Sequence, residues 1–467
     1  MSETQVMWFR RDLRLADNPA LAAAQSGGGR LVALFVLDPA LLRGPRVGAP
    51  RLAYLADALA DLHDRLAERG SRLVVRHGRP AEVVPRLAAE VGAAAVHVSD
   101  DLSPFARRRD EEVARRLAED GRSLEAHDGV LVHPPGRITT GAGDPYRVFT
   151  PFHRAWRRHG PPDPRPSPAA LPPAPEVTGD GIPDRRSLGA ATAPAEPVGG
   201  EGPALTRLEA FLGQRASAYH EHRDLLGVEG TSRLSADLHY GCLSPRTVLA
   251  RLAEDDPGHA AFATEIAWRD FYGHVLHAWP EVVDTEFNPV WRALPWHGEG
   301  PGLDAWREGR TGFPVVDAAM RQLRTTGWMH NRARMIVASF LCKDLRVDWR
   351  LGEAHFLRHL VDGDVASNNG GWQWAAGTGT DAQPYFRIFN PTSQGRRFDP
   401  DGAYVRRWVP ELAAVPDRHL HEPAAMPAPI AAEAGVRLGQ DYPWPIVDHA
   451  EERRRTLAWF KEHRLEG

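Results

Sequence analysis

The chain has 467 residues, of which 42% are hydrophobic and 25% charged, and its formal net charge is −4 at pH 7. This length exceeds one ordinary hydrophobic core and predicts two domains. The negative charge provides no overall attraction for nucleic acid, although a local basic patch can bind DNA on an acidic protein. Cys242 and Cys342 are the only cysteines, so the sequence excludes a disulfide framework, a cysteine-based zinc site and a four-cysteine iron–sulfur site.

No apolar run approaches the roughly 18 residues that a membrane span requires. The first five residues, Met1–Gln5, lack the basic start and apolar stretch of a signal peptide. We therefore expect a cytoplasmic protein.

Residues 1–130 alternate short apolar runs with amphipathic stretches. Apolar residues recur at helical spacing around residues 51–69, 81–91 and 106–119. This alternation predicts an α/β domain with a doubly wound parallel sheet, covered by helices on both faces. No GxGxxG follows the first apolar run, so the dinucleotide-binding fingerprint is missing. The expected strands are Val6–Phe9, Leu31–Leu37, Arg72–Arg76 and Ala94–Val98.

A proline-rich stretch follows, because 11 of the 40 prolines lie within residues 160–200. Proline fixes φ and removes a backbone donor, so this stretch should be an extended connector. Helical patterns dominate from there to the end, as in residues 201–215, 245–253, 261–278 and 314–325. We therefore expect an α/β domain over residues 1–130, a linker over 131–200, and an all-α domain over 201–467.

Aromatic and polar residues are concentrated in the second half. Nine of the 14 tryptophans lie between Trp268 and Trp374, where they could form a large aromatic core or stack on a ligand. The run Val361–Gly371 holds two carboxylates, two amides and three glycines, a composition that suits close contact with a polar ligand. An EF-hand is excluded because no Glu closes the loop, and we expect no metal.

Two further segments could meet a ligand. Hydroxyls and a glycine in Glu229–Ser235 precede a helical pattern, and either N-capping or binding of an anion such as pyrophosphate would explain them. In the segment Gly327–Met335, Asn331 and Met335 are four residues apart and share a helix face. Arg332 and Arg334 are two residues apart and lie on different faces. An arginine here could meet either a phosphate or a buried acid.

These segments, in this order, resemble the cryptochrome/photolyase family over nearly the whole chain. The motifs that carry the resemblance are Trp8–Arg14, Thr231–Ser235, Glu265–Arg269, Trp328–Met335, Asp362–Trp374 and Pro384–Pro391. The resemblance implies an N-terminal antenna domain linked to a helical FAD domain. It also implies a carbon–carbon lyase that repairs cyclobutane pyrimidine dimers in DNA by electron transfer from photoexcited reduced FAD.

Positions around FAD follow from the same resemblance. Asn368 corresponds to the residue that faces flavin N5, and Arg334 with Asp362 corresponds to a buried ion pair. The positions that match contacts to the phosphates and ribityl chain are Tyr219, Thr231, Ser232, Leu234 and Ser235, and those around the isoalloxazine are Asn331, Arg334, Asp362, Asp364 and Asn368.

The resemblance also implies a pocket for the flipped-out lesion, with Trp268 and Trp374 as an aromatic wedge. Glu265 would hydrogen-bond a thymine carbonyl, and Asn331, Met335 and Arg269 match other dimer contacts. Arg223, Arg332 and Arg387 are candidate phosphate contacts. Trp372, Trp349 and Trp296 match the tryptophan relay that re-reduces oxidised flavin, with core packing as the alternative.

Within the family, Asn331, Met335 and Asn368 favour the class I cyclobutane dimer branch. By resemblance, (6-4) photolyases place histidines at the first two positions, and cryptochromes often place an acid or a cysteine at the third. The sequence departs from relatives at Asp270, where many carry Glu, and at Phe262, where Trp is frequent.

An antenna chromophore is a further expectation from the resemblance. Folate-binding relatives carry an acid near residues 102–106, and none lies between Leu102 and Arg109. An 8-hydroxydeazaflavin is therefore favoured over methenyltetrahydrofolate, with Arg51, Asp101 and Phe105 as contacts, and no bound antenna is the alternative.

Two other functions stay open: a cryptochrome-type blue-light sensor with the same flavin and relay but no repair, and a flavin oxidoreductase with soluble electron donors. The missing dinucleotide fingerprint argues against the oxidoreductase. The expected partner is DNA that contains pyrimidine dimers, bound by a monomer without a protein partner.

Overall fold

A computed structural model describes residues 3–27, 29–44, 46–382 and 384–464. The chain forms two units, each built from several segments. The first unit contains Met1–His220, Ser232–Pro280 and Val361–Ala366, and the second contains Glu221–Thr231, Glu281–Leu360 and Ser367–Gly467. Among the described helices, none combines the length and the hydropathy that a membrane crossing requires.

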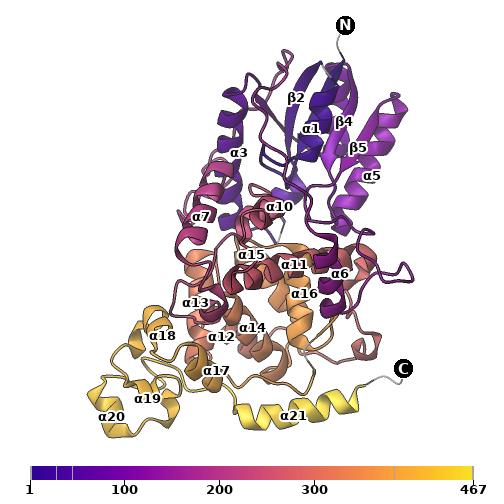
Figure 1. The fold of residues 1–467 in the computed structure, drawn as a ribbon. Helices are drawn as coiled ribbons and strands as arrows, with labels where there is room; N and C mark the ends of the chain where they lie inside the picture. The colour runs from indigo at the N-terminus through magenta and orange to yellow at the C-terminus, as the bar shows by residue number, and fades with distance from the viewer. Residues whose placement is uncertain (1–2, 28, 45, 383, 465–467) are drawn as a thin grey trace. The chain divides into compact units, whose positions relative to one another are not determined.

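A five-stranded parallel sheet lies in the first unit, with strand order β3-β2-β1-β4-β5 (Figure 1). The central strand pairs Val6 with Val32 on one side and with Val96 on the other. The first four strands confirm the sequence prediction. The strands are β1 (Thr4–Phe9), β2 (Arg30–Leu37), β3 (Leu73–His77), β4 (Ala93–Ser99) and β5 (Ser123–His127).

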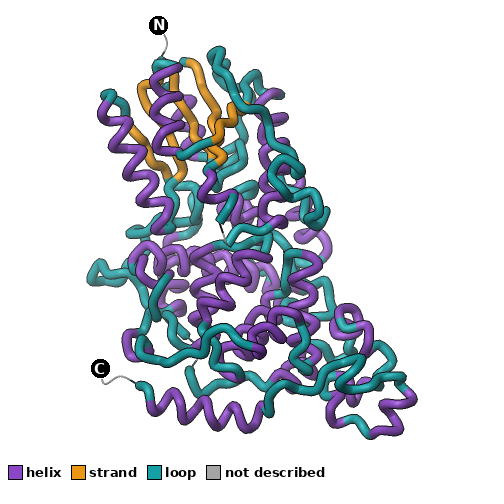
Figure 2. Tube along the Cα trace, turned by 180° about the vertical axis from the view of Figure 1, so that it is seen from behind, coloured by secondary structure: helices purple, strands orange, loops and turns teal. Residues whose placement is uncertain are grey.

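Helices cover both faces of this sheet, as the orange strands between purple helices show (Figure 2). Val6 and Trp8 of β1 belong to one buried cluster with Leu87 of helix α4 and Leu117 of helix α5. Side chains alternate along a strand, so Met7 and Phe9, which are also buried, point to the opposite face. The predicted α/β fold class, with a helical C-terminal part, is confirmed. The helices along this part of the chain are α1 (Pro19–Ser26), α2 (Pro39–Leu42), α3 (Ala49–Ala67), α4 (Pro80–Glu90) and α5 (Pro104–Glu119).

The proline-rich segment 160–200, all of which is described, contains no helix or strand. It packs along the edge of the sheet in the first unit. Leu171 N donates to Arg69 O at 2.9 Å, Asp180 N donates to Val75 O at 2.8 Å, and the Val177 side chain joins the core cluster. The segment is therefore fastened to the α/β core, and the sequence-based domain limits stay a prediction.

The first unit also contains the 22-residue helix α11 (Pro257–Ala278). Asp256 caps this helix by accepting from Gly258 N and His259 N. Asp270 is buried and accepts hydrogen bonds from Val132 N, His133 N and Trp156 Nε1 at 3.0–3.1 Å. The shorter acid at this position thus fastens α11 to the neighbouring loop and helix. The other helices are α6 (Phe149–His159), α7 (Glu201–Gln214), α9 (Ser235–Tyr240) and α10 (Pro245–Leu249), with α8 (Tyr219–His222) where the chain passes to the second unit.

The second unit is helical in its described part and encloses a large apolar core that includes Trp306, Trp349 and Trp372. Its long helices are α12 (Pro301–Glu308), α13 (Pro314–Thr326), α14 (Asn331–Ser339), α15 (Trp349–His359), α16 (Val365–Ala376), α17 (Pro391–Phe398) and α21 (His449–Glu462). Its short elements are the π-helix η3 (Phe340–Asp344), the 3-10 turns η1 (Pro280–Val283), η2 (Pro289–Trp291), η4 (Pro410–Leu412) and η5 (Pro423–Ala425), and α18 (Ala403–Trp408), α19 (Asp417–Leu420) and α20 (Ala428–Glu433).

Candidate functional site

The segment that the sequence predicts for phosphate binding has an unusual backbone. Arg233 has φ 55°, a left-handed conformation that is uncommon for a residue other than glycine. Ser232 Oγ accepts from Leu234 N at 3.3 Å, and α9 then begins at Ser235 without a side-chain cap on its first turn. Ser232, Leu234 and Ser235 lie in the first unit, whereas Thr231 ends a segment of the second.

Tyr219 precedes this segment in the chain and is buried in the first unit. Its ring packs edge to face against Phe211 and Phe262, with centroids 5.8 and 5.3 Å away. Phe262, the departure noted in the sequence, therefore belongs to an aromatic cluster behind a predicted FAD contact.

Asp364 is the centre of a charged cluster in the first unit. Its carboxylate accepts a hydrogen bond from the Arg11 guanidinium, and His239 Nδ1 lies 3.6 Å from Oδ2. Burial opposes ionisation, but Arg11 and His239 hold the pKa of Asp364 well below its usual range. The predicted FAD residue is thus a fixed carboxylate. Asp362 is buried in the same short segment.

Asn331 and Met335 lie on one face of α14, as their spacing predicts, with Nδ2 and Sδ 3.8 Å apart. Arg332 points elsewhere, with NH2 2.9 Å from Asp224 Oδ1 and its guanidinium 4.4 Å from the Phe398 ring centroid. Arg334 Nε donates to Met329 O at 2.9 Å. Arg334 and Asp362 belong to different units, so their expected pairing stays a prediction.

Asn368 on α16 donates from Nδ2 to Glu353 O at 3.1 Å. The neighbouring Asn369 is buried and donates to Val282 O at 2.9 Å and to Glu353 Oε1 at 3.3 Å. These bonds fix the orientation of α16 against α15 and with it the amide of Asn368.

The three tryptophans predicted for electron transfer all lie in the second unit. Trp372 and Trp349 are buried, while Trp296 is partly exposed. The Trp372 ring lies against Gly352 of α15, where an added Cβ would be only 2.2 Å from Cη2. Trp349 Nε1 and Trp296 Nε1 donate to the same atom, Glu286 Oε1, at 3.2 and 3.1 Å. Trp349 and Trp296 are therefore linked through one carboxylate oxygen, and Trp372 packs against the helix that carries Trp349.

Helix α11 carries Glu265, Trp268 and Arg269 of the predicted lesion pocket. Glu265 shares a face with Trp268 and Arg269, three and four residues further on. One face of the Trp268 indole is covered by Phe149, with ring centroids 3.6 Å apart and planes within 7°. The Arg269 guanidinium donates to Val130 O at 2.6 Å and to Leu238 O at 3.1 Å, so it also has a structural role.

The remaining predicted DNA contacts differ in exposure. Arg387 is exposed, Arg223 is partly buried, and Trp374 is partly buried against the core of the second unit. Trp268 and Trp374 belong to different units, and the wedge that they would form stays a prediction.

The predicted antenna contacts lie in the first unit. Asp101 is buried with Oδ1 3.6 Å from Arg11 NH1, Phe105 is exposed, and Arg51 O accepts from Tyr240 Oη at 2.8 Å. Burial opposes the charge of Asp101, but Arg11, Arg10 and Arg109 lower its pKa. Asp101 is thus already paired within the protein.

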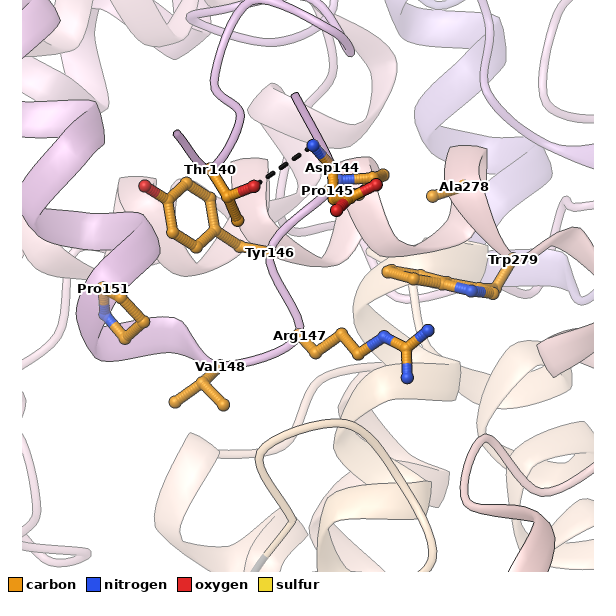
Figure 3. A pocket seen from close by; sticks show the side chains of 9 residues that line it. All are labelled: Thr140, Asp144, Pro145, Tyr146, Arg147, Val148, Pro151, Ala278 and Trp279. Atoms are coloured by element: carbon orange, nitrogen blue, oxygen red, sulfur yellow. Dashed lines mark hydrogen bonds between the residues drawn. The ribbon is translucent and has the colours of Figure 1, made fainter. Parts of the chain in front are cut away.

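A cavity of about 750 Å³ opens in the first unit beside the end of α11 (Figure 3). The Arg147 guanidinium lies 5.2 Å from the Trp279 ring centroid, and Asp144 N donates to Thr140 Oγ1 at 3.1 Å. The residues predicted from the sequence do not line it. The lining residues are Thr140, Asp144, Pro145, Tyr146, Arg147, Val148, Pro151, Ala278 and Trp279.

Sequence reasoning missed several residues at these positions, chiefly Phe149 behind Trp268, Glu286 between two tryptophans, and Arg11 with His239 at Asp364. Each contact joins residues far apart in the chain, so no local spacing reveals it. Of these residues, only Arg11 could have been selected from the sequence, because it lies within the Trp8–Arg14 motif.

Two models of known protein families match the sequence of this chain. Residues 5–173 match the family model described as DNA photolyase, and residues 262–462 match the model described as the FAD binding domain of DNA photolyase. This chain belongs to the DNA photolyase family. The second match confirms the expectation of an FAD-binding domain.

Individual relatives agree over almost the entire length. The deoxyribodipyrimidine photo-lyase of Escherichia coli is 43% identical over 99% of this chain and 99% of its own, and that of Streptomyces griseus is 44% identical over 96% and 97%. A class III photolyase from Agrobacterium tumefaciens has a similar structure, with a TM-score of 0.90, 39% identity and coverage of 99% and 98%. A Synechocystis cryptochrome also has a TM-score of 0.90, with 30% identity and coverage of 98% and 99%.

Proposed function

We propose that this protein repairs cyclobutane pyrimidine dimers in DNA by light-driven electron transfer, as a class I photolyase. The observation that carries the proposal is the arrangement on α11, where Glu265 and Trp268 share a face and Phe149 supports one side of the indole. Relatives named deoxyribodipyrimidine photo-lyase, at 39–44% identity, support the same reaction.

Trp268 would stack on the flipped-out lesion with the indole face opposite Phe149, because Phe149 holds the ring in place. Glu265 would hydrogen-bond a thymine carbonyl and stabilise the negative charge that develops there. Asn331 and Met335, side by side on α14, would contact the dimer with an amide and a thioether. Of the arginines, Arg223, Arg332 and the exposed Arg387 would contact phosphates, and Arg269 would contact the dimer.

The residues present suit FAD. Hydroxyls at Ser232 and Ser235, beside a first helical turn without a side-chain cap, suit phosphate and ribityl oxygens, and the ionised Asp364 suits a hydroxyl or N–H donor. When bound, reduced FAD would supply the electron for cleavage. Residues of the first unit proposed to hold it are Tyr219, Ser232, Leu234, Ser235, Asp362 and Asp364, and those of the second are Thr231, Asn331, Arg334 and Asn368.

A Glu265→Gln variant tests the proposal. Repair of a dimer-containing oligonucleotide by pre-reduced enzyme should fall by about 30-fold or more, since a hydrogen bond to developing charge contributes roughly 2–4 kcal/mol. Photoreduction of bound flavin should persist. If repair by the variant equals that of the wild type, Glu265 does not have the proposed role.

A second candidate function is that of a blue-light sensor that does not repair DNA, and the similarity to the Synechocystis cryptochrome favours it. A sensor would bind flavin and photoreduce it but leave dimers intact. Assaying repair and photoreduction on one preparation therefore separates the two functions.

We also propose that Trp372, Trp349 and Trp296 re-reduce oxidised flavin. Trp372→Phe should slow photoreduction while repair by pre-reduced enzyme is retained. If photoreduction is unchanged in this variant, the three tryptophans do not re-reduce the flavin as proposed.

For the antenna, we propose an 8-hydroxydeazaflavin near Arg51, Asp101 and Phe105. The absorption spectrum of the purified protein should contain a visible band beyond those of FAD. A spectrum of FAD alone would contradict this proposal, and a folate band would point to methenyltetrahydrofolate.

Finally, we propose a cytoplasmic monomer, for which sedimentation should give a mass near 51.5 kDa.

A further inference from the structure

Glu286 joins two tryptophans of the proposed relay through one oxygen atom. Its Oε1 accepts from Trp296 Nε1 at 3.1 Å and from Trp349 Nε1 at 3.2 Å. The glutamate side chain is only 4% exposed. Both indole N–H groups therefore point at the same buried carboxylate, although Trp349 is 63 residues from Glu286 in the sequence.

The carboxylate is charged. Burial opposes ionisation, but hydrogen bonds and the charge of Arg350 lower the pKa of Glu286 below its usual value. Arg350 NH2 donates to Glu286 Oε2 at 2.9 Å, which leaves Oε1 for the indoles. A negative charge in a poorly solvated site favours the loss of an electron from an adjacent indole, because it stabilises the resulting positive ring.

The two indoles differ in a second neighbour. The Arg350 guanidinium lies 4.6 Å from the ring centroid of Trp349, so its positive charge opposes a positive charge on that ring. Trp296 instead packs against the neutral ring of Trp459, with centroids 5.0 Å apart. With Glu286 shared, the positive charge is more stable on Trp296 than on Trp349.

We propose that Glu286 and Arg350 give the relay its direction. An electron passes from Trp296 to oxidised Trp349, so Trp349 is reduced and Trp296 is oxidised, and no covalent bond or proton is exchanged in this step. The oxidant is photoexcited oxidised flavin acting through Trp372, and a soluble thiol restores Trp296. Glu286 is a positioning residue here, and the inference rests on the relay in the proposed function.

The test compares Glu286→Gln with Glu286→Asp in the FAD-loaded enzyme. Glutamine keeps the size and an accepting Oε1 but removes the charge, whereas aspartate keeps the charge on a shorter side chain. Initial photoreduction with dithiothreitol, normalised to bound FAD, should fall about tenfold in Glu286→Gln, because a neutral acceptor replaces the charged one that stabilises the positive indole. Transient absorption should show a correspondingly shorter-lived tryptophan radical, and Glu286→Asp should retain most of the rate.

A purely structural role for Glu286 predicts the opposite order, with glutamine tolerated better than aspartate, and that order would overturn the proposal. Glu452→Gln is the matched control, because Glu452 is also buried and ion-paired, with Arg346 at 2.6 Å. It should photoreduce at the wild-type rate.

Two further measurements separate the possible failures. Repair by pre-reduced Glu286→Gln should equal that of the wild type, because this reaction does not use the relay. If Trp372→Phe slows photoreduction and Glu286→Gln does not, the inference is overturned and the relay stands. If neither variant slows it, the relay is absent and the inference falls with it, while the repair function is judged by the dimer assay alone.

Discussion

Lys343 is one of two lysines in the chain, and its side chain is buried in the π-helix η3 of the second unit. Its Nζ donates to Arg387 O at 3.0 Å, which fastens the segment that carries a proposed phosphate contact. Burial lowers the pKa of Lys343 from its ordinary value of 10.5 to about 8. Below that pH the folded state therefore carries the cost of a buried charge.

A Lys343→Met variant should show this cost. The pKa of the folded state lies below that of the unfolded chain, so the penalty is full below pH 8 and is lost as the pH rises towards 10.5. The difference in unfolding free energy, variant minus wild type, should therefore become less positive over this range. Urea unfolding at several pH values measures it, and a difference that does not vary with pH would contradict a buried charged lysine.

Arg11 offers a second test of single residues, because it neutralises Asp364 in the first unit. Arg11→Met should leave that carboxylate without its main partner and cost about 2–3 kcal/mol, somewhat less than for a fully buried pair because Arg11 is partly exposed. Arg115→Met is the control, since Arg115 pairs with Glu112 on the surface and should change stability by less than about 1 kcal/mol. Equal losses of unfolding free energy in the two variants would show that the Arg11–Asp364 pair contributes no more than a surface ion pair.

At the scale of elements, α15 and α16 approach closely because Gly352 has no side chain. An added Cβ would lie 2.2 Å from Trp372 Cη2 and 2.7 Å from Leu341 Cδ2, well inside van der Waals contact. The glycine therefore sets the position of a proposed relay tryptophan.

Gly352→Ala should destabilise the protein by about 1–3 kcal/mol through overpacking, despite the better helix propensity of alanine. Gly213→Ala on α7 is the control, because a Cβ there would meet no atom within 4 Å, and it should be neutral or stabilising by up to about 1 kcal/mol. Thermal unfolding compares them. A stabilised Gly352→Ala would mean that the two helices are not in close contact.

The elements also show what could be predicted from the sequence. Four strands were predictable because each contains a short apolar run, as is typical of a buried parallel sheet. Strand β5 was missed because Ser123–His127 is a polar edge strand whose residues are half-buried or exposed. The helix face of Asn331 and Met335 followed from their spacing, whereas the contacts of Glu286, Phe149 and Asp364 depend on tertiary packing and could not be predicted.

At the scale of the whole molecule, the order of motifs along the chain identifies the family, and the full-length similarity to photolyases agrees. The motif residues are nevertheless distributed over two units in alternating segments, as Thr231 and Ser232 illustrate.

The most direct test of the account is restoration of thymines in a dimer-containing oligonucleotide by the FAD-loaded, reduced protein under blue light. We expect normal thymines to return in proportion to the light dose, with no repair in the dark. Intact dimers after illumination, with the flavin bound and reduced, would contradict the proposed repair function.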